Sequence, residues 1–129
     1  MKKLWGVIAG LIAAFIVVFA IEMISHMIYP PPVVEDPTDY DAISKLLYQA
    51  PLGALIIVII GHMIGMFVGT VITLKIAKEK SAAYILIGVF VLLTAMNLYL
   101  IKHPLWFAIS DVAAVILGGG IPYLAFSKK

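Results

Sequence analysis

Long apolar segments alternate with short polar connectors along this chain, and each of the long segments is able to cross a lipid bilayer. A helix needs about 20 predominantly apolar residues to span roughly 30 Å of hydrocarbon. The pattern predicts an all-α polytopic membrane protein, with four transmembrane helices in one bundle that forms a single domain, 1–129. The predicted spans are residues 4–28, 51–76, 82–101 and 104–126.

Composition agrees with this class and removes several others. Hydrophobic residues make up 64% of the chain and charged residues only 12%, against about 45–50% and about 25% in soluble domains. The chain has no cysteine, which excludes disulfides, thiolate metal sites and a cysteine nucleophile. It carries no basic patch with interleaved aromatics and no nucleotide or serine-hydrolase motif. Nucleic acid is therefore not an expected partner, and an enzymatic activity has no support.

The lysines predict the orientation in the membrane. They supply all of the basic charge, because the chain has no arginine. Only Lys45 and Lys102 fall on one side of the predicted spans, whereas the other lysines, including Lys128 and Lys129, fall on the opposite side. Positive residues accumulate in cytoplasmic segments. We therefore expect both termini to lie in the cytoplasm.

The first span is expected to be retained and not cleaved as a signal peptide. Its apolar run is longer than the 7–15 residues of a signal-peptide core, and no small-x-small cleavage site precedes Glu22. The span ends at three prolines, 30–32, which cannot continue a helix.

The outer loop, residues 30–49, is acidic and contains a candidate short helix near residues 39–50. Thr38 is the predicted N-cap of this helix, since a threonine hydroxyl can accept from the first free backbone amides. One side of the segment is apolar, so the helix would lie flat on the outer interface. An ordinary connector without that role is the alternative.

A small-residue face marks the second span. Gly61, Gly65 and Gly69 recur every four residues, a spacing that lets two helix backbones approach closely in lipid. His62 lies only about 20° from Gly69 around the helix, so it is expected to point toward packed protein. The glycine face packs either against another helix of the same chain or against a second copy.

Polar residues within the spans predict a pocket in the outer leaflet. From a rise of about 1.5 Å per residue, Glu22 and Asp111 each lie roughly 10 Å below the outer ends of their helices. Asn97 falls at a similar depth on the third span. We expect the three side chains to converge in one outward-opening pocket, with His26 at its mouth. The structural alternative is that Glu22 hydrogen-bonds Asn97 or Thr94 and fixes the helix register.

The same residues are the candidates for a metal or cofactor site. A zinc site needs three or four ligands around one point, and Glu22, His26, His103 and Asp111 are the available set, but no paired-histidine motif fixes their geometry. A bis-histidine haem site is disfavoured, because His26 and His62 differ by roughly 10 Å in depth. We predict no cofactor, no metal and no catalytic residue.

Three short segments carry a family resemblance. They are Tyr-Pro-Pro-Pro at 29–32, Pro-Leu-Gly-Ala at 51–54 and His-Pro-Leu-Trp-Phe at 103–107. Spaced in this way across four spans, they resemble a group of uncharacterised small bacterial four-helix integral membrane proteins. The resemblance implies a bacterial inner membrane and brings no activity with it.

The first functional hypothesis is therefore a non-enzymatic scaffold or subunit that packs through the glycine face of the second span. The alternative is an oligomeric binding or transport unit with a proton- or ligand-binding pocket in the outer leaflet. A metal-binding membrane protein is the third. The expected partners are the lipid bilayer, a second copy of the chain and a small molecule or ion whose identity the sequence leaves open.

Overall fold

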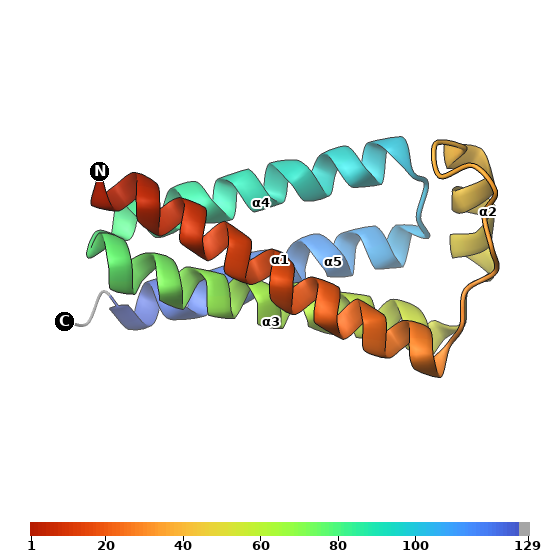
Figure 1. Cartoon of the computed structure of the whole chain (residues 1–129), viewed down its shortest axis with the longest axis horizontal. Helices are drawn as coiled ribbons and strands as arrows, with labels where there is room; N and C mark the ends of the chain where they lie inside the picture. Colours follow the sequence, from red (N-terminus) through yellow and green to blue (C-terminus); the bar gives the residue numbers. More distant parts are fainter. Residues whose placement is uncertain (127–129) are drawn as a thin grey trace.

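The structure is a computed structural model that describes residues 1–126, and within them it contains helices and no strand. Four long helices run lengthwise in a bundle, while a short one crosses one end of it (Figure 1). This confirms the predicted all-α bundle of four apolar helices. Lys128 and Lys129, which entered the prediction of orientation, lie outside the described residues. The helices are α1 (Lys2–Ile28), α2 (Tyr40–Gln49), α3 (Leu52–Ala77), α4 (Lys80–Leu100) and α5 (Leu105–Phe126).

Helix α3 is the centre of the bundle, since its contacts with α1 and α5 are the two most extensive between any helices. Its glycine face packs on α1, where Gly6, Gly10 and Ala14 form a matching buried stripe. A Cβ at Gly69 would lie 2.6 Å from the carbonyl oxygen of Gly10, so the two backbones are in direct contact. The Thr73 hydroxyl also donates to the carbonyl of Gly6 at 2.9 Å. The close packing of small residues in lipid is thus used within the chain.

Helix α5 reaches α3 in the same way on the other side. A Cβ at Gly118 would collide with the backbone carbonyl of Met63. Met66 of α3, Leu86 of α4 and Val115 of α5 are fully buried where the helices meet. Glycine on one helix and large side chains beside it therefore set the spacing between α3 and α5.

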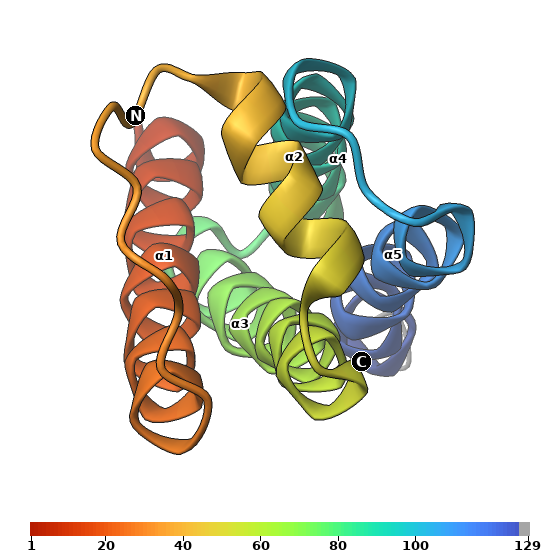
Figure 2. The same cartoon turned by 90° about the vertical axis from the view of Figure 1, so that its right-hand side faces the viewer.

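Helix α2 lies across the end of the bundle (Figure 2). The Tyr48 hydroxyl donates to the His103 carbonyl at 3.0 Å, and the Lys102 amide donates to Ser44 Oγ at 2.8 Å. These bonds attach α2 to the connection between α4 and α5. The helix predicted between the first two spans exists, and its position is fixed by polar contacts to that connection.

The predicted cap of α2 was wrong by one residue. Asp39 is the N-cap, and its carboxylate accepts from the Ala42 amide at 3.1 Å. The Thr38 hydroxyl instead donates to Asp36 at 2.6 Å, and the Thr38 amide donates to the same oxygen at 2.9 Å. These hydrogen bonds hold the pKa of the Asp36 carboxyl below its usual value.

Candidate functional site

A pocket of about 370 Å³ lies between α1 and α4, and α3 and α5 complete its wall. Helices α1 and α4 lie close together at the end of the bundle that holds the N-terminus, and they diverge toward α2 (Figure 1). The rings of Phe15 and Phe90 pack with centroids 5.7 Å apart and lie at the edge of this opening. We call this cavity the α1–α4 pocket. Its polar lining residues are Glu22, His62, Thr94, Asn97 and Asp111.

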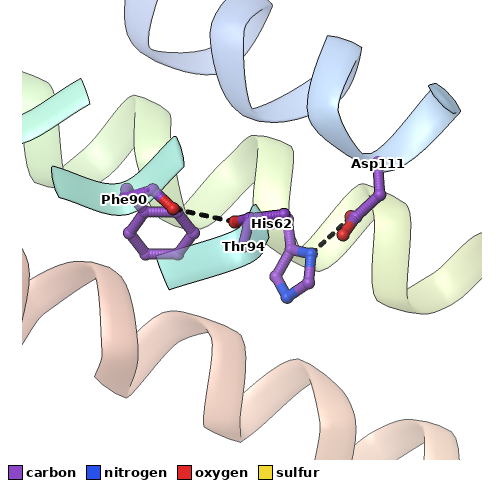
Figure 3. Close-up of polar contacts among 4 residues, drawn as sticks. All are labelled: His62, Phe90, Thr94 and Asp111. Atoms are coloured by element: carbon purple, nitrogen blue, oxygen red, sulfur yellow. Dashed lines mark hydrogen bonds and ion pairs between the residues drawn. The ribbon is translucent and has the colours of Figure 1, made fainter. Parts of the chain in front are cut away.

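The closest polar contact in this pocket joins α3 to α5. His62 Nδ1 lies 2.5 Å from Asp111 Oδ1, and Figure 3 shows the imidazole directed at the carboxylate. Asp111 is 1% exposed, and the His62 side chain is 16% exposed. A carboxylate buried this deeply is costly unless it has a partner. His62 provides that partner, as a hydrogen-bond donor when neutral and as a counter-charge when protonated.

The helix packing explains why these two side chains meet. Asp111 and Gly118 are seven residues apart, two helical turns, so they lie on one face of α5. Gly118 touches the backbone of Met63, which directly follows His62 on α3. The small residue at 118 thereby brings the two helices close enough for an imidazole to reach a carboxylate.

Glu22 enters the same pocket from α1. Its carboxylate has no hydrogen bond or ion pair with any of the residues 1–126. The Thr94 hydroxyl donates to the Phe90 carbonyl at 2.8 Å, one turn back on its own helix (Figure 3). The register-fixing hydrogen bond from Glu22 to Thr94 or Asn97 is therefore not formed. Glu22 faces the cavity without a protein partner.

Glu22, Asn97 and Asp111 thus line one pocket, whereas His26 is exposed and is not part of its lining. His26 was predicted to lie at the mouth of the pocket, and the structure does not place it among the residues that line it. On the helix, His26 follows Glu22 by one turn, but the side of α1 that is buried here carries Ser25. The histidine that completes the pocket is His62.

Sequence reasoning assigned His62 to the packing face from its angle to Gly69, and its counted depth gave no reason to pair it with Asp111. Counting residues gave about 16 Å for His62 and about 10 Å for Asp111. That count assumes that all outer helix ends are level. Figure 1 shows that α3 extends further toward α2 than α5 does, which removes part of the difference. The buried Gly65 and Gly69 beside His62 were the usable signal that it faces protein.

His103 is held in the connection between α4 and α5, away from the pocket lining. Its Nδ1 lies 2.7 Å from the Ile101 carbonyl oxygen, and its ring stacks on Phe107 with centroids 5.0 Å apart. Burial lowers the pKa of His103 below its usual value, and the bond to the Ile101 carbonyl partly opposes this shift. His103 therefore favours its neutral form in the folded chain.

The four candidate zinc ligands, Glu22, His26, His103 and Asp111, do not come together around one point. Among the residues that the structure describes, no three His, Asp or Glu side chains lie close enough to hold one metal ion. His26 is exposed, and His103 is outside the pocket lining. The groups that the pocket offers to a ligand include two carboxyls, one imidazole and one amide.

These features define the class of protein. Four helices, α1, α3, α4 and α5, have the length and the apolar composition needed to cross a bilayer, which makes the chain a multi-pass membrane protein. Comparisons with protein-family models, with curated proteins and with solved structures find no match to it.

Proposed function

We propose that this protein is a non-enzymatic binding or transport unit of the cell inner membrane, which takes up a proton or a small ligand in the α1–α4 pocket. The observation that carries the proposal is the His62–Asp111 pair in the wall of a cavity that Glu22 also lines. Ionisable residues inside a membrane domain are expensive, and they mark ligand, ion or proton sites.

The packing of the glycine face supports this choice over the scaffold hypothesis. Gly61, Gly65 and Gly69 are buried, and each lies against a residue of α1 in the same chain. That face is occupied, so an assembly of copies would use a different surface. The pocket, in contrast, contains Glu22, whose carboxylate has no partner among the described residues.

A cysteine at Leu93 is expected to react with a small water-soluble thiol reagent, because Leu93 lines the α1–α4 pocket. Its neighbour Leu92 on α4 is the matched control, since it is 61% exposed but lies outside the pocket lining. We expect Leu93→Cys to react about tenfold faster than Leu92→Cys, as a thiol in contact with lipid has no water to ionise it. The native chain has no cysteine, so no background labelling interferes.

Labelling rates would be measured on each purified variant in lipid nanodiscs by mass spectrometry. Equal rates at positions 92 and 93 would mean that the pocket is filled by lipid and does not admit polar ligands. That result would contradict the proposal.

We also propose that both termini face the cytoplasm and that α2 lies outside, with the lysine distribution as support. Val33→Cys and Ser81→Cys test this without changing any charge, since both residues are exposed, Val33 in the connection before α2 and Ser81 in the first turn of α4 at the opposite end of the bundle. In intact cells, a membrane-impermeant maleimide should label Val33→Cys but not Ser81→Cys. After permeabilisation both should react. The reverse pattern in intact cells would invert the orientation.

A further inference from the structure

The charge lining the α1–α4 pocket has one prevailing sign. Glu22 and Asp111 are acidic, and His62 is the one basic group among the described residues that line it. His62 is committed to Asp111 at 2.5 Å, which leaves Glu22 unpaired. A cation near Glu22 would gain an attraction that is stronger than in water, because the surroundings have a low dielectric constant.

The rest of the lining is aromatic and apolar. Phe15, Phe19 and Phe90 border the cavity, and the rings of His62 and Phe90 form a T-shaped contact with centroids 6.1 Å apart. Ring faces attract cations within about 6 Å and also bury apolar groups. The pocket therefore combines an unpaired carboxylate with aromatic surface, and its volume falls in the range of about 300–1,000 Å³ typical of small-molecule sites.

The position of the opening restricts what can enter. Residues that line the pocket are exposed on the sides of the bundle, since Phe15 of α1 is 47% exposed and Leu93 of α4 is 39% exposed. Phe19 is 63% exposed at this opening, and in a bilayer the sides of the helices face hydrocarbon. A ligand that enters here must tolerate both lipid and a charged site, which is a property of amphipathic molecules.

We propose that the α1–α4 pocket binds a monovalent organic cation with an apolar body. Its charge lies beside Glu22, and its apolar part packs between Phe15, Phe19 and Phe90. This inference rests on the proposed function and specifies its ligand class. An anion would meet two acidic groups, and a neutral ligand would leave Glu22 unpaired. A bare metal ion would lack the three ligating side chains that it needs among the described residues.

The test is equilibrium dialysis of the native chain in nanodiscs against three probes. Benzyltrimethylammonium carries both the charge and the ring, tetramethylammonium carries the charge alone, and benzenesulfonate carries the ring with the opposite charge. Glu22→Gln removes the proposed counter-charge, and Glu35→Gln removes the same charge from the exposed outer loop. Nanodiscs without protein give the background from lipid.

We expect benzyltrimethylammonium to bind more tightly than either other probe. Glu22→Gln should weaken its binding about tenfold, the change that 1.4 kcal/mol produces, while Glu35→Gln should leave it unchanged. Equal binding of benzenesulfonate or of tetramethylammonium, equal binding to Glu22→Gln, or no binding above background would each overturn the inference. If no probe binds while Leu93→Cys still reacts selectively, the ligand class is wrong and the proposed pocket function remains.

Discussion

Gly69→Ala is expected to push α1 away from α3 and to lower the free energy of unfolding by about 1–3 kcal/mol, the usual range for an overpacked core. The added Cβ would lie 2.6 Å from the Gly10 carbonyl oxygen and 3.0 Å from the Ala14 Cβ. The first contact is with backbone, which cannot rotate away as a flexible side chain can. Unfolding in detergent, followed by circular dichroism, measures the loss.

Gly88→Ala is the matched control for this change. It makes the same substitution in another membrane-spanning helix, α4, where an added Cβ meets nothing within 4 Å. We expect no loss of stability there, since alanine is the better helix former. If the two variants lose the same amount, the backbone contact between α1 and α3 does not stabilise the bundle in the way described.

The sequence was sufficient to predict the elements because the physics that defines them is local. Uninterrupted apolar length determines a membrane span, and proline determines where the first one ends. The structure has its four long helices at the predicted places and α2 within the predicted outer-loop segment. The cap of α2 was missed by one residue because Asp36, Thr38 and Asp39 all carry suitable side-chain oxygens. Which one caps depends on the turn that precedes the helix.

The pocket was harder to predict because it depends on how the helices are placed relative to one another. Glu22, Asn97 and Asp111 could be grouped by depth, since each is counted along its own helix. The pairing of His62 with Asp111 needs the axial offset of α3 and its rotation, which follow from the glycine contacts of Gly69 and Gly118. Those contacts become visible only once the partner helices are known.

Removing His62 is expected to destabilise the bundle more than removing its partner does. In His62→Leu the carboxyl of Asp111 stays buried without a counter-charge, and losing one member of a buried pair costs about 3–5 kcal/mol. In Asp111→Leu the imidazole can remain neutral, so the loss should be nearer the about 1–3 kcal/mol of an unsatisfied neutral group. The double variant should lose less than the sum of the two, because it leaves neither partner alone.

Detergent unfolding of the native chain and the three variants completes the cycle. The control is His26→Leu, an exposed histidine that should change stability by no more than about 0.5 kcal/mol. Strictly additive losses from His62→Leu and Asp111→Leu would mean that the 2.5 Å contact contributes no coupling, and the pair could then no longer support a functional pocket.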